Sequence, residues 1–413
     1  MTASAHPTLQ VLALPAMRWF LAARFTLMFA RSLVAAMLSY HVFVVTDSYA
    51  ALGLLGLVEF VPVIPSSLVA GVVADRFDRR TILLISAGVS LLGAGLLAAL
   101  TWKDPDAIPA VLALAFGLAI VMGFARPANS ALLPNLVPRE IFQNAAVVAS
   151  SAVQLAFISG PIAMGFLVGP FGLAAPYALA VVFYGLAFLC LWALPRIRTG
   201  DASTEISWRA VKEGISFVWR NQPILGSLTL DMLAVIFAGA TALLPVYAEE
   251  ILQVGPEGYG LLRASIAVGT FTMALFLMMI RPFKRPGRAL LVSVLFFGVA
   301  TIVFGLSRSL ALSALAFVIA GMADQVSMTT RAVILQMSTP DKLRGRVSAV
   351  NFIFIGASNE LGEAESGFLA SLTSATFSVV AGGAACLGVL GFVTWRMPRL
   401  RDYRPSPTGE PPS

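Results

Sequence analysis

Runs of about twenty uncharged, mostly apolar residues recur along the whole chain, and they constrain its fold more than any other feature. A helix of that length crosses the hydrocarbon core of a bilayer, which is about 30 Å thick. Only 12% of the 413 residues are charged and 58% are hydrophobic, whereas about 25% of the residues in a soluble domain are charged. Because a soluble core could not bury so much apolar surface, the sequence predicts a polytopic all-α membrane protein.

We expect twelve transmembrane helices arranged as two bundles of six. The longest connection, residues 196–222, separates an N-terminal bundle at 18–195 from a C-terminal bundle at 223–396. The twelve apolar segments lie at 18–45, 50–73, 81–101, 108–132, 146–168, 174–195, 223–248, 258–281, 289–306, 309–336, 347–371 and 374–396.

Three segments lie outside these bundles. Residues 1–17 form an N-terminal segment, and the polar, proline-rich residues 397–413 are expected to form a disordered tail. In the linker 196–222 the apolar residues recur at helical spacing, which predicts an amphipathic helix on the membrane surface and a tether between the bundles. These apolar residues are Trp208, Val211, Ile215 and Val218.

The basic residues predict the orientation of the chain in the membrane. If both termini lie on one side, most of the 28 lysines and arginines fall in loops on that side. The loops of the opposite face contain only Lys103 and Arg308. Positively charged loops stay in the cytoplasm, so both termini are expected there. Because the positive charge is spread over short loops and forms no single patch, we expect no binding of nucleic acid.

The two bundles show traces of an internal repeat. A shift of 202 residues places Pro138 on Pro340, Gly160 on Gly362 and Arg18 on Arg220. Two six-helix halves of the same topology are typical of transporters that rock around a central cavity.

Charge is concentrated in the short connection between the second and third apolar segments, GVVADRFDRR at 71–80. This stretch resembles the loop signature G-x-x-x-D-R-x-G-R-R of the major facilitator superfamily, with Asp78 where the pattern has glycine. The residues that match are Gly71, Asp75, Arg76, Arg79 and Arg80. The phrases RFDRRTILL, SALLPNLVPRE, EGISFVWRN and PDKLRGRVSAV resemble the bacterial exporter branch that includes the enterobactin (siderophore) exporter.

The resemblance implies a fold and roles for two motifs. It implies twelve helices in two pseudo-symmetric bundles in the bacterial cytoplasmic (inner) membrane, and a cytoplasmic latch at 71–80 with Asp75 as its pivot. The alternative role of that loop is to anchor the topology. In the fifth helix, Gly160, Pro161 and Gly165 resemble the antiporter motif G-P-x-x-G-G, with Met164 in place of one glycine. These glycines would also permit close helix packing.

Eleven ionisable residues lie inside the apolar segments, where a charge costs about 2.5–3.5 kcal/mol at mid-helix. They are Arg24, Arg31, Glu59, Arg126, Asp231, Arg263, Asp324, Arg331, Glu360, Glu363 and Glu365. In one interpretation they neutralise one another as structural pairs. Asp324 and Arg331, seven residues apart on one helix, would then form such a pair or contact a neighbour. In the other they line a cavity.

The second interpretation assigns candidate functional roles. A buried carboxylate favours its neutral form, so it can load and release a proton as the cavity changes sides. The candidates for proton coupling are Glu59, Asp231, Asp324 and Glu360. The candidates for the substrate cavity are Arg31, Arg126 and Glu363, with Arg31 preferred because an arginine can hold an anionic group or tune a carboxylate.

Other sequence signals narrow the function. The chain has no G-x-x-x-x-G-K-[ST] phosphate loop and no HExxH motif, so neither ATP nor a catalytic metal is expected, and no cofactor. We predict a monomeric secondary transporter, not an enzyme, that exports a small organic molecule such as a siderophore or an amphipathic drug in exchange for protons. The alternatives are proton-coupled uptake by the same fold, and a non-transporting membrane sensor or lipid-handling enzyme.

Overall fold

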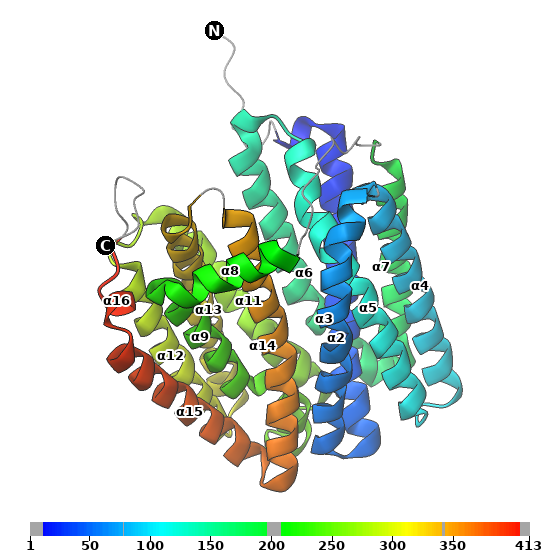
Figure 1. Cartoon of the computed structure of the whole chain (residues 1–413). Helices are drawn as coiled ribbons and strands as arrows, with labels where there is room; N and C mark the ends of the chain where they lie inside the picture. The colour runs from blue at the N-terminus through cyan, green and yellow to red at the C-terminus, as the bar shows by residue number, and fades with distance from the viewer. Residues whose placement is uncertain (1–10, 77, 196–207, 341–342, 405–413) are drawn as a thin grey trace. The chain divides into compact units, whose positions relative to one another are not determined.

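The computed structural model describes residues 11–76, 78–195, 208–340 and 343–404, and every regular element in this part of the chain is helical (Figure 1). Some side chains within helices are not described, including those of 67–76, 126–128 and 208–211. Contacts divide the chain into two units. The first unit is Met1–Asp47 with Val58–Glu205, and the second is Ser48–Leu57 with Ile206–Ser413.

The first unit contains six long helices. They are α2 (Pro15–Thr46), α3 (Tyr49–Arg76, whose first part groups with the second unit), α4 (Arg79–Lys103), α5 (Ile108–Leu132), α6 (Phe142–Phe171) and α7 (Ala174–Ala193). Two short 3-10 turns, η1 (Leu133–Asn135) and η2 (Arg139–Ile141), connect α5 to α6. Helix α3 contains Pro62 and Pro65, and α6 contains Pro161 and Pro170, all within apolar stretches.

The second unit contains a surface helix, six spanning segments and a short final helix. They are α8 (Trp208–Arg220), α9 (Gln222–Phe237), η3 (Ala240–Leu243), α10 (Leu244–Val246), η4 (Tyr247–Ile251), α11 (Gly255–Met279), α12 (Pro286–Leu306), α13 (Leu310–Ser338), α14 (Arg344–Leu372), α15 (Ala375–Arg396) and α16 (Pro398–Arg401). The segment predicted at 223–248 is thus broken after α9, where Gly239 precedes η3.

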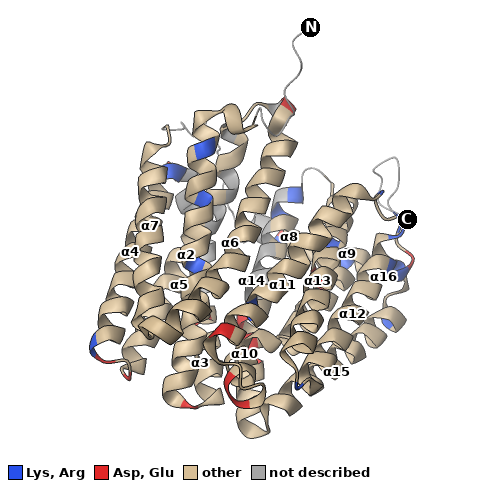
Figure 2. Cartoon of the chain, turned by 180° about the vertical axis from the view of Figure 1, so that it is seen from behind, with Lys and Arg blue, Asp and Glu red and all other residues tan. Residues whose placement is uncertain are grey.

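The helices have the length and apolarity that a bilayer requires. Within the described residues, ten helical segments are long and apolar enough to cross a membrane, and Tyr49–Pro62 is a shorter apolar helix. Figure 2 shows the bodies of α4, α7, α12 and α15 without charge. Helix α14 is not among the ten, and it contains Glu360, Glu363 and Glu365. All twelve expected segments coincide with helices, and the predicted all-α fold is confirmed.

The two units repeat the same helix pairing. In the first unit α2 packs against α5, α6 and α7, while α4 packs against α5 and α7. In the second unit α9 packs against α13, α14 and α15, and α12 packs against α13 and α15. Five helices of each unit thus correspond at the same place in the order, as expected for a parallel repeat: α2 and α4 to α7 in the first unit, and α9 and α12 to α15 in the second.

A pair of glycines marks equivalent contacts in the repeat. Gly160 of α6 lies against the backbone of α2, where an added Cβ would be 3.0 Å from the nitrogen of Leu33. Gly362 of α14 lies against α9, where an added Cβ would be 2.7 Å from the carbonyl oxygen of Val235. The alignment of these two glycines in sequence thus reflects the same close helix approach in both units.

Helices α11 and α13 also pack backbone to backbone, which leads to a first prediction. A methyl group on Gly321 would overlap the carbonyl oxygen of Ile266, whereas one on Gly391 of α15 would have no atom within 4 Å. Gly321→Ala is therefore expected to lower the free energy of unfolding by about 1–3 kcal/mol. Gly391→Ala should leave the free energy of unfolding unchanged or raise it by about 0.5–1 kcal/mol. Unfolding in mixed micelles measures both, and equal stability of the two variants would contradict the close packing.

The C-terminal segment differs from the expected disordered tail 397–413 at its start. Residues 398–401 form α16, and both Leu400 and Tyr403 are buried because these apolar side chains pack against α9 and α12. The Ser338 hydroxyl donates a 2.8 Å hydrogen bond to the Tyr403 hydroxyl. Residues 405–413 lie outside the described part of the chain.

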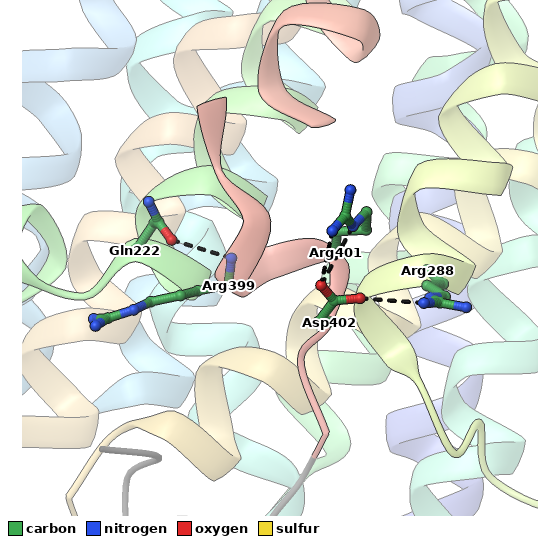
Figure 3. Close-up of polar contacts among 5 residues, drawn as sticks. All are labelled: Gln222, Arg288, Arg399, Arg401 and Asp402. Carbon is green, nitrogen blue, oxygen red and sulfur yellow. Dashed lines mark hydrogen bonds and ion pairs between the residues drawn. The ribbon is translucent and has the colours of Figure 1, made fainter. Parts of the chain in front are cut away.

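Polar contacts complete the attachment of this segment (Figure 3). Asp402 accepts hydrogen bonds from Arg401 at 3.0 Å and from Arg288 of α12 at 3.2 Å. The Arg399 backbone amide donates to the Gln222 side chain at the start of α9, at 3.2 Å. The hydrogen bonds from Arg401 and Arg288 lower the pKa of Asp402 from its ordinary value. These contacts attach residues 399–402 to the N-terminal ends of α9 and α12.

Candidate functional site

A buried ion pair joins α9 to α13 in the second unit. The Arg331 guanidinium contacts the Asp231 carboxylate, and these residues are only 5% and 6% exposed. The Ser327 hydroxyl donates a 3.1 Å hydrogen bond to the other oxygen of Asp231. Removing two charges from water is costly, and a pair offsets that cost only when it is well hydrogen-bonded. Asp231 meets this requirement, because both of its oxygens have a partner.

Helix α13 brings a second carboxylate to the same place. Asp324, Ser327 and Arg331 are spaced i, i+3 and i+7, so they lie on one face of the helix. Asp231 and Asp324 line one small cavity together with Ser327 and with Ser293 of α12. Its volume of ≈ 10 Å³ is close to what one water molecule requires. The structure therefore brings together two of the four carboxylates considered for proton coupling.

The two carboxylates of this cavity differ in their partners. Asp231 is held by Arg331 and Ser327, whereas Asp324 forms no ion pair or hydrogen bond with any other described residue. Chemically, the cluster combines a neutralised carboxylate with a carboxyl group that has no counter-charge among the described residues. Within the described residues no group of three or more His, Cys, Asp or Glu side chains is placed to hold a metal ion.

The carboxylates of α14 have other surroundings. Glu363 lies near the Thr241 hydroxyl of η3 and within electrostatic reach of Arg263 of α11. Arg263 in turn donates a 2.9 Å hydrogen bond to the Tyr259 hydroxyl. Glu360 also lies on α14 and takes part in further polar or electrostatic contacts. The acidic candidates of the second unit thus occupy two environments, one between α9 and α13 and one on α14.

The candidates of the first unit lie on three helices. Arg31 of α2 is within electrostatic reach of the buried Tyr184 of α7. Arg24, two turns earlier on α2, lies over the Phe20 ring at 5.8 Å from its centre. Glu59 lies on α3 and takes part in contacts of its own. The side chain of Arg126 on α5 lies outside the described residues.

The charged stretch at 71–80 is only partly described. The side chains of Asp75 and Arg76 and the surroundings of Gly71 lie outside the described residues, so the geometry of the expected pivot is not described. Asp78, which stands where the family pattern has glycine, is the N-cap of α4 and accepts hydrogen bonds from the Arg80 amide and the Thr81 hydroxyl. The acidic side chain thus satisfies one of the free amides at the helix start.

The last arginine of this stretch binds the end of another helix. The Arg80 side chain donates hydrogen bonds to the carbonyl oxygens of Leu191, at 3.0 Å, and of Trp192. These carbonyls belong to the last turn of α7, where the helix dipole favours a cation. Arg79 also takes part in contacts within the described chain.

The motif in the fifth helix lies at a close helix contact. Gly160, Pro161 and Gly165 are all buried on α6, as is Met164. The Ser32 hydroxyl of α2 donates a 2.9 Å hydrogen bond to the carbonyl oxygen of Ala156, one turn before Gly160. The first of these glycines therefore serves the packing of α6 on α2.

Three neutral hydroxyl residues of these sites were not identified from the sequence. Ser293, Ser327 and Thr241 are common residue types in membrane helices and carry no charge signal. The position of Ser327 was recoverable, because it lies between Asp324 and Arg331 on the same helical face. Ser293 and Thr241 reach the acidic residues only through the packing of separate helices.

Comparison with known proteins agrees with this architecture. The family model of the Major Facilitator Superfamily matches residues 20–363. Enterobactin exporter EntS of Escherichia coli strain K12 is 25% identical over 394 residues, covering 95% of this chain and 94% of EntS. A POT family transporter solved with a thioalcohol conjugated peptide has a TM-score of 0.74 at 15% identity, covering 93% of this chain and 96% of that one. The nucleoside transporter NupG has a TM-score of 0.68 at 13% identity, covering 94% and 100%.

The family match covers most of the chain, and the helix pairing shows the repeat that this fold requires. A multi-pass membrane protein with this architecture belongs to a class of transporters that are not enzymes. The chain is therefore a member of the Major Facilitator Superfamily.

Proposed function

We propose that this protein is a secondary active exporter that exchanges a small organic molecule for protons by alternating access. The proposal of export rests on the similarity to an enterobactin exporter along nearly the whole length of both chains. It places the protein in the bacterial cytoplasmic membrane as a monomer, with both termini in the cytoplasm. The substrate class is a siderophore or a comparable amphipathic compound.

The observation that supports proton coupling is the unequal pair of carboxylates at one small cavity. Arg331 neutralises Asp231, while Asp324 faces the same cavity without a counter-charge among the described residues. Asp324 is half-buried. A carboxylate without a counter-charge in apolar surroundings favours its protonated form, and hydration of its surroundings reverses that preference. We assign the proton to Asp324 and treat Asp231, Glu59 and Glu360 as secondary candidates.

The remaining charged candidates are assigned to substrate and gating. Arg31, Arg126 and Glu363 would face the transported molecule, where a fixed charge can select a complementary group. Asp75, with the basic residues around it, would act as the cytoplasmic latch. Such ion pairs are individually weak, about 0–1 kcal/mol when exposed, but several that exist in one conformation only can shift its population.

Proton-coupled uptake is the second candidate. It is favoured by the fold similarity to structures described as a POT family transporter with a bound peptide conjugate and as a nucleoside transporter. These similarities concern the fold alone, because the sequence identities are 15% and 13%. A membrane sensor or lipid-handling enzyme has no comparable support, since the chain belongs to a transporter family.

Transport into everted membrane vesicles tests direction and coupling together. The vesicles expose the cytoplasmic face, and respiration acidifies their lumen. An exporter should accumulate an added substrate inside the vesicles and release protons, and a protonophore should abolish the accumulation. The added panel would contain catecholate and hydroxamate siderophores and amphipathic cations. Release of preloaded substrate together with protons would indicate uptake instead. Accumulation that does not depend on the pH gradient would exclude proton coupling.

A further inference from the structure

The surface helix α8 presents two different faces. One face is exposed and combines basic with apolar side chains at i, i+3, i+7 and i+8, namely Lys212, Ile215, Trp219 and Arg220. Trp219 is 66% exposed although it is the largest apolar side chain among the described ones of the helix. Lys212 and Arg220 form no ion pair with another described residue.

The opposite face fixes α8 to the helices of its own unit. Val218 is buried in a cluster with residues of α9, α13 and α14. Gly214 lies against the backbone of α14, where an added Cβ would be 3.0 Å from the Arg346 carbonyl oxygen. Glu213, an exposed residue at the edge between the two faces, forms an ion pair with the Arg346 side chain. Helix α8 therefore cannot turn its exposed face inward without breaking these contacts.

These contacts also revise the expected character of the helix. The spacing of Ile215 and Val218 suggested that both face the membrane surface, but Val218 packs on the protein and only Ile215 is exposed. The side chains of Trp208 and Val211 lie outside the described residues. The surface available to lipid is the narrower face that includes Trp219.

The connection to α9 sets the level of this face. A single residue, Asn221, separates α8 from α9, and its side chain caps α9 by accepting from the Ile224 amide at 3.2 Å. Helix α9 begins a segment that is long and apolar enough to span a membrane, and Trp219 and Arg220 precede that segment by only three and two residues. This places them next to the expected membrane boundary. Figure 1 shows α8 lying across the helices of the second unit and not continuing the axis of α9.

The positions of the other tryptophans support placing Trp219 at the membrane boundary. All five with described side chains are exposed and lie within a few residues of a helix end, namely Trp19, Trp102, Trp192, Trp219 and Trp395. Trp395 and Arg396 end α15 as Trp219 and Arg220 end α8. Tryptophan concentrates at the headgroup level of membranes, with arginine and lysine beside it on the cytoplasmic side.

We propose that the exposed face of α8 binds the headgroups of anionic phospholipids. Lys212 and Arg220 lie eight residues apart, about 12 Å along the helix axis, on either side of the apolar pair. Ile215 and Trp219 would enter the boundary of the acyl chains, while the two basic side chains bind phosphate and acidic headgroups above it. A zwitterionic headgroup would complement the apolar residues but not the net positive charge. This inference depends on the membrane setting and not on the direction or coupling of transport.

Quenching of Trp219 fluorescence by brominated lipid tests this preference directly. The protein is reconstituted in phosphatidylcholine containing a small fraction of either brominated phosphatidylglycerol or brominated phosphatidylcholine. The difference between wild type and Trp219→Phe isolates the Trp219 signal. We expect phosphatidylglycerol to be enriched at Trp219 by about fivefold for each of the two basic residues.

Matched variants decide the outcome. Lys212→Gln/Arg220→Gln should remove the preference, and Lys212→Glu/Arg220→Glu should reverse it. Lys284→Gln/Arg285→Gln removes the same amount of charge from the exposed connection between α11 and α12. This variant should keep the preference for phosphatidylglycerol. Equal quenching by the two lipids in wild type, a preference that survives in Lys212→Gln/Arg220→Gln, or no quenching of Trp219 at all would each overturn the proposal.

Discussion

Replacing Arg331 with Met is expected to lower the free energy of unfolding by about 3–5 kcal/mol. The variant removes the guanidinium from a pair in which both side chains are almost completely buried, and it leaves the Asp231 carboxylate without its counter-charge. Ser327 still donates one hydrogen bond, but a single hydroxyl cannot offset the cost of a buried charge. Unfolding of the purified protein in mixed micelles, titrated with a denaturing detergent, measures the loss.

The double variant Asp231→Asn/Arg331→Met serves as the control. It removes both charges, so most of the stability lost in Arg331→Met should return, as in a double-mutant cycle with strong coupling. Ser327→Ala should have a smaller effect, about 1–3 kcal/mol, because it leaves one carboxylate oxygen without its donor. If the single and double charge variants are equally unstable, Arg331 stabilises the fold through contacts other than Asp231.

The fold could be predicted because lipid leaves a chain few alternatives. Backbone groups in hydrocarbon must be hydrogen-bonded internally, so every long uncharged run becomes a helix. The segments at 81–101 and 174–195, for example, correspond to α4 (Arg79–Lys103) and α7 (Ala174–Ala193), and each predicted boundary is within two residues of the observed one. Gly160 and Gly362 indicated the repeat correctly, because a glycine at a close helix contact cannot be replaced without displacing the partner helix.

The candidate site was predicted less completely, because its pairing depends on helices far apart in the sequence. The high cost of intramembrane charge singled out Asp231, Asp324 and Arg331. The spacing of seven left two possibilities, a pair of Asp324 with Arg331 or contacts with neighbouring helices, and seven residues separate two positions by about 10 Å along a helix. The structure pairs Arg331 instead with Asp231 on α9, one hundred residues earlier in the chain. Only tertiary packing fixes that choice.

Short-range chemistry accounts for the remaining differences. Asp78 departs from the family pattern, yet an aspartate at a helix N-cap is a common stabilising choice, and α4 begins at the next residue. The composition of the tail suggested disorder, but two apolar residues in a short polar segment, Leu400 and Tyr403, are enough to dock it. Composition averages over such anchors and therefore does not reveal them.

Substituting Asn for Asp324 is expected to separate proton movement from substrate movement. An amide has nearly the shape of the carboxyl group but cannot take up or release a proton, so substrate-driven proton flux should fall at least about tenfold, to the level of protein-free vesicles. Exchange of labelled for unlabelled substrate, which requires no net proton movement, should continue. Proteoliposomes with an internal pH-sensitive dye and radiolabelled substrate measure the two rates in the same preparation.

Two variants make this result specific to the cavity between α9 and α13. Asp324→Glu keeps a titratable group beside Ser293 and Ser327 and should retain coupled flux, while Glu365→Gln removes a carboxylate of α14 that accepts from Ser366 and should leave coupling intact. If coupled flux persists in Asp324→Asn, another carboxylate must carry the proton. Glu360→Gln and Glu59→Gln would then be the next variants to measure. Loss of exchange together with coupling would instead assign Asp324 to substrate binding, because a group that carries only the proton is not needed when substrate is exchanged for substrate.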